Sequence, residues 1–454
     1  MLAHPALEGL TYHVKTFGCQ MNLHDSERVS GVLGACGCVE VGTPEEADIV
    51  VYMTCCVREK ADTHLYGQVS AMVSAPKPPS GRRIVAVGGC IAQRDGGDIR
   101  EHMPNVDVVF GTRAVGSLPE LIEDALRGNG TLATDTSEDD PRFSTDLPSR
   151  REASWHAWVP IMTGCNNFCS YCIVPYVRGR ERDRRFEDIV SEVERLKADG
   201  VREVCLLGQN VNSFGRQRYG APRFAELLRA VGETGIERIR FTSSHPKDLS
   251  DETIAAMAET DAVMPQLHLA VQSGSTKVLK AMNRHYTRED FISLAGRIKD
   301  ANPGIALSTD IIVGFPGETE EDFEQTLSLV REVGFASAFT FIYSKRPGTP
   351  AAKIDDPTPR EVIQGRFDRL AELVADLAYE ANQSELGATV EALVEGPSKR
   401  NPNVLVGHSP KNKTVLFDVP DGREASELVG KLVDVRADEA KTWYLRGPMV
   451  GEPR

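Results

Sequence analysis

The pattern of hydrophobic and polar positions divides the chain into three parts, the first covering residues 11–128. Thr11–Phe17 alternates as a half-buried strand does, and three later apolar runs are typical of buried strands. The predicted strands are Thr11–Phe17, Asp48–Met53, Ile84–Val87 and Val106–Phe110, with helical patterns at Asp25–Ala35 and Val57–Val73. Strands that alternate with helices predict a parallel α/β sheet.

The second part, residues 153–384, follows a polar, acidic segment at 129–152 that is predicted to be a linker. The predicted strands of this part are Trp158–Met162, Glu203–Leu207, Arg238–Phe241, Gln266–Val271, Ala306–Val313 and Ala338–Tyr343. Its clearest helical patterns are Phe186–Ala198, Thr319–Val333 and Arg360–Glu380. Six strand–helix repeats favour a partial β/α barrel over a complete eightfold one.

The last part, residues 385–450, contains short β-prone runs between Gly, Pro and Asn turns. These runs are Val390–Val394, Val404–Val406, Thr414–Phe417 and Leu432–Val435. They predict a small five-stranded β-barrel of the oligonucleotide-binding kind. The fold class is therefore α/β, with a parallel α/β domain, a partial barrel and a C-terminal β-barrel.

Composition then limits the class of protein. The 454 residues are 41% hydrophobic and 26% charged, which is ordinary for a soluble globular protein. No apolar run approaches the ~20 residues that span a bilayer, and Met1–Leu10 does not resemble a secretory signal. We therefore expect a cytoplasmic protein without membrane contact. The net charge of −14 argues against a surface coated in positive charge, but it allows a local basic groove.

Three of the 10 cysteines lie within eight residues, directly after the first predicted barrel strand: Cys165, Cys169 and Cys172, named here the loop cysteines. Barrel enzymes carry their active sites on the loops that follow strands. Thiolates at this spacing suit zinc or an iron–sulfur cluster, and three ligands leave one metal position open. The alternatives are three buried thiols or an incomplete zinc site.

Three other cysteines each follow a predicted strand of the first part: Cys19, Cys55 and Cys90, named here the sheet-edge cysteines. The carboxyl ends of parallel strands lie along one edge of the sheet, so these thiols are expected to converge there. Coincidence among many cysteines is the alternative. Cys56 adjoins Cys55, and spacing alone hardly distinguishes the two. Cys36, Cys38 and Cys205 are interpreted as structural.

The strings around these cysteines resemble the methylthiotransferase family of radical S-adenosylmethionine enzymes. They are Lys15–Asn22 (KTFGCQMN), Val57–Ala61 (VREKA), Val87–Cys90 (VGGC) and Gly164–Arg182 (GCNNFCSYCIVPYVRGRER). The resemblance covers nearly the whole chain and includes a C-terminal segment similar to a TRAM domain. It favours Cys55 over Cys56, because the family ligand stands in Thr-Cys-x-x-Arg-Glu, although Met53 replaces the Asn usual before that Thr.

The resemblance implies two 4Fe-4S clusters. The loop cysteines would hold one, whose open iron binds S-adenosylmethionine for reductive cleavage to a 5′-deoxyadenosyl radical. The sheet-edge cysteines would hold an auxiliary cluster that carries the sulfur to be transferred, and a second S-adenosylmethionine would supply the methyl group. An electron donor such as flavodoxin or ferredoxin is expected, and the protein is expected to be a monomer.

Polar or Gly-rich groups at the predicted strand ends are candidate contacts to S-adenosylmethionine. They are Gln209, Asn210, Ser244, Gln272, Ser273, Asp310 and Gly314. Gln209 and Asn210 stand where many radical enzymes of this kind carry Gly-Gly-Glu. A role as a turn former or core cap is the alternative for each.

The implied reaction is methylthiolation of carbon 2 of N(6)-dimethylallyladenosine next to the anticodon of tRNA. Asn166–Phe168 and Ile173–Arg180 favour this branch over relatives that act on threonylcarbamoyl-adenosine in tRNA or on a ribosomal-protein aspartate. A non-catalytic iron–sulfur RNA-binding or electron-carrier protein is the rival from another class. The tRNA anticodon stem-loop would be bound by the basic run Arg178–Arg185 and by basic and aromatic residues of the last part: Lys399, Arg400, Lys411, Lys413, Lys441, Trp443 and Tyr444.

Overall fold

The computed structural model describes residues 4–18, 20–56, 59–134 and 147–454, which form two compact units. The N-terminal unit comprises residues up to 152 together with 163–166 and 173–181. The C-terminal unit comprises 153–162, 167–172 and 182–454. The chain therefore passes repeatedly from one unit to the other around the loop cysteines.

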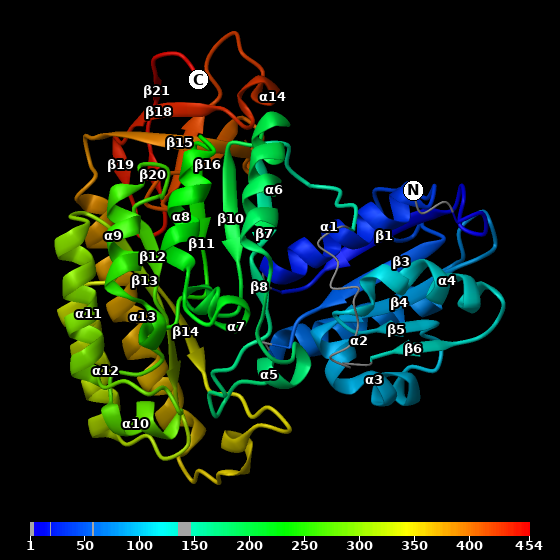
Figure 1. Cartoon of the computed structure of the whole chain (residues 1–454), viewed down its shortest axis with the longest axis horizontal. Helices are drawn as coiled ribbons and strands as arrows, with labels where there is room; N and C mark the ends of the chain where they lie inside the picture. Colours follow the sequence, from blue (N-terminus) through cyan, green and yellow to red (C-terminus); the bar gives the residue numbers. More distant parts are fainter. Residues whose placement is uncertain (1–3, 19, 57–58, 135–146) are drawn as a thin grey trace. The chain divides into compact units, whose positions relative to one another are not determined.

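The N-terminal unit is built on a six-stranded sheet in the order β2-β1-β3-β4-β5-β6, with every pair parallel (Figure 1). Its strands are β1 (Thr11–Thr16), β2 (Val39–Glu40), β3 (Ile49–Thr54), β4 (Ile84–Gly89), β5 (Val108–Phe110) and β6 (Thr131–Ala133). Its helices are α1 (Gln20–Ala35), α2 (Glu59–Ser74), α3 (Cys90–His102), α4 (Leu118–Leu126) and α5 (Val174–Val177). The predicted parallel α/β sheet is confirmed.

Helices cover both faces of this sheet, as the continuous apolar runs of β3 and β4 require. One face packs against α2, α3 and α5 through a cluster that includes Val50, Val87 and Val177. The opposite face packs against α1 and α4 through a cluster that includes Val51 and Ile122. Alternate residues of each central strand thus enter different cores, which fixes the register of the sheet.

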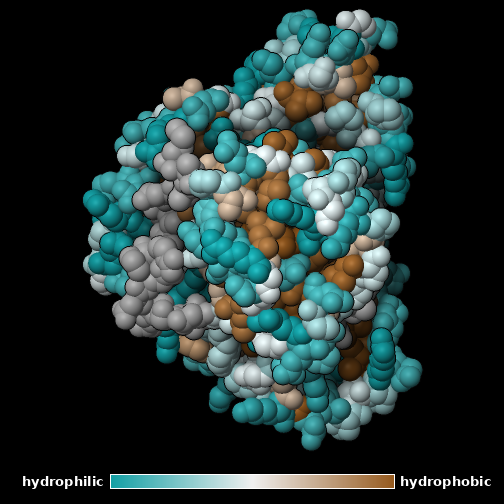
Figure 2. All heavy atoms as spheres, turned by 90° about the vertical axis from the view of Figure 1, so that its right-hand side faces the viewer, coloured by the Kyte–Doolittle hydropathy of each residue, from teal (hydrophilic) through white to brown (hydrophobic). Residues whose placement is uncertain are grey.

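The two edge strands are short and were not predicted. β2 has two residues and β6 has three, and β6 lies within the segment predicted as a linker. Each exposes one large apolar side chain, Val39 and Leu132. Short edge strands limit pairing of the sheet with other chains. Figure 2 shows a face of the molecule on which hydrophobic side chains lie among hydrophilic ones.

The C-terminal unit begins with six parallel strands in chain order. β7 (His156–Pro160), β10 (Glu203–Leu207) and β11 (Arg238–Phe241) form one sheet. β12 (Gln266–His268), β13 (Ala306–Val313) and β14 (Ser337–Ile342) form another. Parallel bridges from Ile239 to Val263 and from Ser244 to Leu269 join the two sheets, which gives the predicted partial barrel.

Helices follow most barrel strands and share one apolar core with them. The longer ones are α6 (Phe186–Ala198), α8 (Phe224–Glu233), α9 (Asp251–Glu259), α11 (Arg288–Ala301), α12 (Glu320–Val333) and α13 (Arg360–Gln383). The shorter ones are α7 (Arg216–Tyr219) and α10 (Thr276–Ala281). Among the residues described, no helix combines the length and apolar character needed to cross a membrane.

The chain ends in a curled sheet in the order β19-β20-β17-β16-β15-β18-β21. Its main strands are β15 (Thr389–Pro397), β16 (Val404–His408), β17 (Thr414–Asp418) and β18 (Leu432–Arg436). β19 (Glu439–Ala440), β20 (Leu445–Arg446) and β21 (Met449–Val450) have only two residues each, so their periodicity is unreadable in sequence. The sheet has seven strands rather than the five predicted, although all four predicted runs are strands.

Two buried arginines of β11 join the barrel to this sheet. Arg238 donates to the His408 carbonyl at 3.0 Å and to Glu391 Oε1 at 2.7 Å. Arg240 donates to Glu203 Oε2 at 2.8 Å and to the Ser409 carbonyl at 2.7 Å. Charged hydrogen bonds from buried guanidinium groups fix one domain against the other more firmly than surface ion pairs do.

Candidate functional site

The ends of β3 and β4 bring Cys55 and Cys90 to the same edge of the N-terminal sheet. Cys55 directly follows β3, and Cys90 is the first residue of α3, directly after β4. Thr54 joins the two strand ends, because its hydroxyl donates to the Gly88 carbonyl at 2.6 Å and accepts from the Ile91 amide at 3.1 Å. Both cysteines are buried.

The end of β1 reaches the same place through Gly18. A Cβ atom on Gly18 would lie 2.1 Å from the Cys55 Cβ, and the φ of 122° at Gly18 is one that other residues rarely adopt. Cys19, the next residue, lies outside the described residues. The convergence of all three sheet-edge cysteines therefore stays a prediction.

The remaining cysteines differ from Cys55 in their surroundings. Cys56 is packed in the apolar cluster beneath α2 and α3. Burial raises the pKa of the Cys38 thiol to about 12, and burial likewise raises the pKa of Cys36 and Cys205. These last three are neutral buried thiols, in agreement with the structural role predicted for them.

The start of the cysteine loop is held by contacts with the residues that follow α5, all within the N-terminal unit. The Cys165 amide donates to the Gly179 carbonyl at 3.0 Å. A Cβ atom on Gly164 would lie 2.0 Å from the Arg180 carbonyl oxygen, so only glycine fits there. Asn166 and Glu181 exchange hydrogen bonds between amide and side chain, at 3.2 and 3.3 Å. Cys165 is half-buried.

The middle of the loop is held within the C-terminal unit by the turn that follows α10. The Ser170 amide donates to the Met282 carbonyl at 3.0 Å, and Asn283 Nδ2 donates to the Phe168 carbonyl at 2.9 Å. The Cys172 amide donates to the Cys169 carbonyl at 3.0 Å. Arg284 Nη1 donates to the Cys169 sulfur at 3.4 Å, so Cys169 meets a cationic donor.

The donor chemistry of the loop fits an iron–sulfur cluster. Three cysteines lie on one short loop, and a guanidinium group faces the sulfur of Cys169, as it would face a thiolate. No group of three His, Cys, Asp or Glu side chains within the described part of the chain is arranged to hold a single metal ion. Cysteine thiolates at this spacing are usual ligands of iron–sulfur clusters, in which each thiolate binds its own iron.

Most candidate contacts to S-adenosylmethionine follow barrel strands: Gln209 and Asn210 after β10, Ser244 after β11, Gln272 and Ser273 after β12, and Gly314 after β13. Asp310 lies within β13. Two of them carry buried oxygens without a hydrogen-bond partner among the described residues, Asn210 Oδ1 and Ser244 Oγ. Such atoms are the ones expected to accept a ligand.

The other candidates have local partners. Ser273 Oγ lies 3.4 Å from Thr326 Oγ1 of α12, and Asp310 Oδ2 lies 3.2 Å from His268 Nε2. Gln272 has a φ of 72° and pairs through its backbone with Asp310 and Ile312. Gln209 is half-buried. These contacts account for Ser273 as a packing residue and leave the role of the others a prediction.

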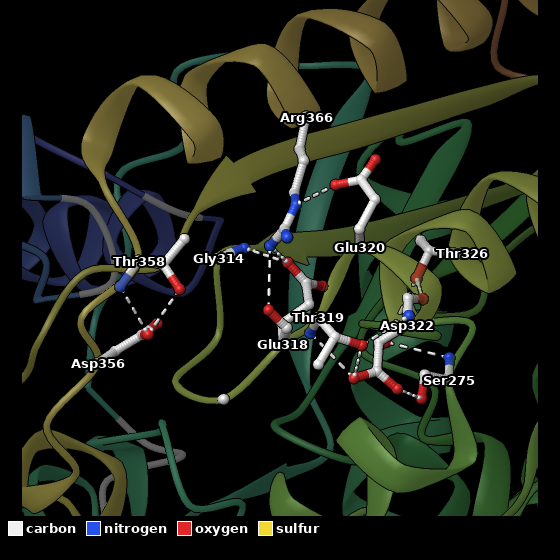
Figure 3. Close-up of polar contacts among 12 residues, drawn as sticks. Ser275, Gly314, Glu318, Thr319, Glu320, Asp322, Thr326, Asp356, Thr358 and Arg366 are labelled. Carbon is white, nitrogen blue, oxygen red and sulfur yellow. Dashed lines mark hydrogen bonds and ion pairs between the residues drawn. The ribbon is translucent and has the colours of Figure 1, made fainter.

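The loop after β13 depends on a buried carboxyl group that the sequence did not single out (Figure 3). Glu318 Oε2 accepts from the Gly314 amide at 2.7 Å and lies 3.6 Å from Arg366 Nη1. Burial raises the pKa of Glu318 to about 7. Thr319 and Asp322 then form a capping box that starts α12. The predicted Gly314 site is thus positioned by Glu318 and Arg366.

His245, which follows the candidate Ser244, is a neutral imidazole. Its Nδ1 accepts from the Lys247 amide at 3.2 Å. Burial, together with the positive charges of Arg284 and Lys247, lowers the pKa of His245 to about 2. Its buried Nε2 has no partner among the described residues, so it is available to a ligand as Ser244 is.

The basic run Arg178–Arg185 is only partly available to a phosphate backbone. Arg178 is buried and donates to Asp25 Oδ2 at 2.9 Å, and Arg184 is buried against Glu192 at 2.6 Å. Arg180 and Arg185 are exposed. The role of Arg178 could not be predicted, because Asp25 lies 153 positions away. Glu192 is only eight positions from Arg184, but no sequence pattern marks that pair.

The C-terminal sheet exposes Trp443 more than any other large hydrophobic side chain among the described residues, at 61%. Lys399, Arg400 and Lys441 are exposed as well. Lys411 instead pairs with Glu385 at 2.7 Å, and Lys413 lies 3.7 Å from the same carboxylate. Lys441 also lies 3.3 Å from Glu439, and Tyr444 is half-buried. In this sheet, the predicted RNA contacts therefore reduce to one exposed aromatic ring and three exposed cations, one of them in an ion pair.

Three family descriptions match the chain. The Radical SAM superfamily matches residues 159–330, the Uncharacterized protein family UPF0004 matches residues 11–111, and the TRAM domain matches residues 383–450. Together they span the parallel α/β sheet, the partial barrel and the curled sheet.

Proteins of known name resemble the chain over most of its length. A tRNA-2-methylthio-N(6)-dimethylallyladenosine synthase of Acidothermus cellulolyticus is 52% identical over 91% of this chain and 84% of its own. Its namesake in Acetivibrio thermocellus is 48% identical over 97% and 91%.

Among solved structures, the radical S-adenosylmethionine methyltransferase TsrM of Kitasatospora setae matches 76% of this chain and 74% of its own, with a TM-score of 0.54 and 14% identity. At that identity the likeness supports the fold alone.

Proposed function

The chain belongs to the tRNA-2-methylthio-N(6)-dimethylallyladenosine synthase family, and we propose that it methylthiolates carbon 2 of N(6)-dimethylallyladenosine next to the anticodon of tRNA. The observation that carries this proposal is the 52% identity to a synthase of that name over 91% of the chain. The loop cysteines and the sheet-edge cysteines would provide the ligands for the two clusters that such a reaction needs. The electron donor would be a flavodoxin or ferredoxin, and the protein would act as a cytoplasmic monomer.

Cys165, Cys169 and Cys172 would hold one 4Fe-4S cluster, and Cys19, Cys55 and Cys90 would hold a second. When bound, the first would supply reductive cleavage of S-adenosylmethionine, and the second would supply sulfur. Tight packing supports the second assignment, since Gly18 approaches Cys55 and Thr54 ties the strand end before Cys55 to the one before Cys90. Burial keeps water from both thiols.

The residues at the barrel strand ends would bind and orient S-adenosylmethionine. Asn210 Oδ1 and Ser244 Oγ are buried acceptors without a partner among the residues described. Because His245 Nδ1 accepts from the Lys247 amide, the neutral imidazole carries its proton on Nε2, which is a buried donor without a partner among the same residues. A ligand with amino or hydroxyl donors and one acceptor would satisfy all three atoms. Gln209, Gln272, Asp310 and Gly314 remain further candidates.

RNA would be bound through exposed groups of both units. Trp443 offers a face on which a base can stack, and Lys399, Arg400 and Lys441 offer cations to phosphates. Arg180 and Arg185 would contribute next to the cysteine loop. Because the salt dependence of binding grows with the number of phosphates neutralised, binding through so few cations should weaken only moderately as salt is added.

The test is mass spectrometry of nucleosides from isopentenylated tRNA. The tRNA is incubated without oxygen with reconstituted protein, a reductant and S-adenosylmethionine. We expect 2-methylthio-N(6)-dimethylallyladenosine. 5′-deoxyadenosine without that product would move the target to threonylcarbamoyl-adenosine or a ribosomal-protein aspartate. Absence of both compounds, with cluster loading verified, would contradict an enzymatic role.

A further inference from the structure

Arg284 is placed against one of the loop cysteines by three directed hydrogen bonds, all within the C-terminal unit. Its Nη1 donates to the Cys169 sulfur at 3.4 Å, its Nη2 to the Ala270 carbonyl at 2.6 Å and its Nε to the Tyr286 hydroxyl at 2.9 Å. The Tyr286 hydroxyl in turn donates to the Val271 carbonyl at 2.8 Å. The guanidinium group is therefore fixed in one orientation, with one edge towards sulfur.

The charge of Arg284 has no carboxylate partner within the described part of the chain. The residue is 4% exposed, and its polar contacts among the described residues are with a thiol, a phenol and a carbonyl. Guanidinium groups stay protonated, and buried charges in proteins are paired. The anion that would balance Arg284 is consequently expected at Cys169, as a thiolate bound to iron.

The backbone on either side of Arg284 is strained in a way that serves this placement. Asn283 has a φ of 59° and His285 a φ of 57°, both in the left-handed region that non-glycine residues rarely occupy. Asn283 Nδ2 also binds the Phe168 carbonyl, next to Cys169. The same turn thus holds the cysteine loop and directs Arg284 to Cys169. Backbone strain of this kind persists only where the surrounding structure requires the strained geometry.

We propose that Arg284 raises the reduction potential of the cluster at the loop cysteines by donating a charged hydrogen bond to the Cys169 sulfur. This inference rests on the proposed function. A cluster that takes up one electron from a reductant becomes more negative by one charge. A fixed cation at hydrogen-bond distance from a ligand sulfur stabilises the reduced form more than the oxidised form. Arg284 is a positioning residue for electron uptake. With a higher reduction potential, the cluster can be reduced by a weaker electron donor.

The experiment is a redox titration of the reconstituted full-length protein, followed by electron paramagnetic resonance. The signal followed is the one that changes when S-adenosylmethionine is added, because that response identifies the cluster to which S-adenosylmethionine binds. In Arg284→Gln we expect the equilibrium constant for reduction to fall at least tenfold. For a one-electron couple this moves the midpoint potential by about 59 mV to more negative values.

Two further variants and one control complete the test. Arg284→Lys keeps the charge but cannot reach all three acceptors at once, so it should shift the midpoint in the same direction by less. Arg288→Gln removes a nearby arginine that binds Glu332 at 2.7 Å, and it should leave the midpoint unchanged. If Arg284→Gln does not assemble a cluster, Arg284→Lys decides the question.

An unshifted midpoint in a variant with normal iron content would overturn the role of Arg284. An equal shift in Arg288→Gln would also overturn it, because the effect would then be one of general charge. A wild-type protein that lacks the signal responsive to S-adenosylmethionine would instead contradict the proposed function. The two failures are therefore distinguishable.

Discussion

The loop cysteines and the sheet-edge cysteines gather three thiols in opposite ways. The loop cysteines lie within eight residues, and a turn after α10 and the backbone of Gly179 hold their loop. The sheet-edge cysteines span 72 positions from 19 to 90, and only the order β1-β3-β4 could bring them together. A short motif tolerates change in the surrounding fold, whereas a site made by strand order depends on the packing of the whole sheet.

The largest effect is expected from the loop. Cys165→Ala should abolish formation of 5′-deoxyadenosine and of the methylthiolated nucleoside, because the cluster that binds S-adenosylmethionine loses a ligand. Chromatography of the reaction mixture measures the first and mass spectrometry the second. Cys205→Ala, which removes a buried thiol from β10 of the barrel, is the matched control and should retain both products. Cleavage that persists in Cys165→Ala would refute the ligand assignment.

Substitutions of the sheet-edge cysteines should have a different effect from those in the loop. Cys90→Ala should retain formation of 5′-deoxyadenosine and lose sulfur insertion, since only the auxiliary cluster is affected. Cys55→Ala should lower the iron content, whereas Cys56→Ala should not, because Cys55 stands at the ligand position of the family and Gly18 packs against its Cβ. Iron analysis and nucleoside mass spectrometry measure both. An intact methylthiolated product from Cys90→Ala would show that the second site is misassigned.

A smaller change tests whether packing, and not only ligands, makes the sheet-edge site. Gly18→Ala places a Cβ atom 2.1 Å from the Cys55 Cβ and should lower the iron bound at the sheet edge. Gly9→Ala is the control, because Gly9 also has a positive φ, 79°, but open space around it. It should cost only about 1 kcal/mol of unfolding free energy and no iron. Equal iron content in the two variants would show that the close approach is dispensable.

The smallest effect is expected from Glu318, which supports the loop after β13. Its folded pKa of about 7 lies above its ordinary value of 4.5, so its stabilising contribution is complete below pH 4.5 and is lost as the pH rises through 7. Between pH 5 and pH 8, the unfolding free energy of the wild type should fall by about 2 kcal/mol more than that of Glu318→Gln. Urea unfolding at several pH values measures this, and parallel curves for the two proteins would contradict it.

The sequence predicts strands best where a clear run of apolar or alternating positions is present. Glu203–Leu207 and Arg238–Phe241, which are buried throughout, and Ala306–Val313, in which every second residue is buried, were predicted with the bounds that the structure has. The edge strands β2 and β6 were not predicted, because two or three residues are too few to show an alternation of hydrophobic and polar positions. β7 begins at His156, two residues before the predicted start, where His156 and Trp155 mask the apolar pattern.

For the candidate site, the thiols were visible in the sequence and their partners were not. Cysteine is rare enough for its spacing to carry information. Arg284 and Glu318 are common residue types, and their roles arise from contacts with residues far along the chain: Cys169 is 115 positions from Arg284, and Arg366 is 48 positions from Glu318. The same limit explains Arg178, which looked available to RNA and is buried in an ion pair with Asp25. Arg184 is buried in an ion pair with Glu192, only eight positions away.

The two arginines of β11 set a limit on how this chain can be cut and recombined. Exchange of residues 385–450 alone with those of a distant relative would bring in a new partner for Arg238 and Arg240 while both stay behind in the barrel. Arg238 would then lose its carboxylate partner Glu391, while Arg240 would keep Glu203 and lose the carbonyl partner that Ser409 supplies. A buried guanidinium group without its partners costs more than a lost surface contact. Viable chimaeras should carry Glu203, Arg238 and Arg240 along with the C-terminal sheet. The point at which the chain can be joined to that of a relative therefore lies within the barrel.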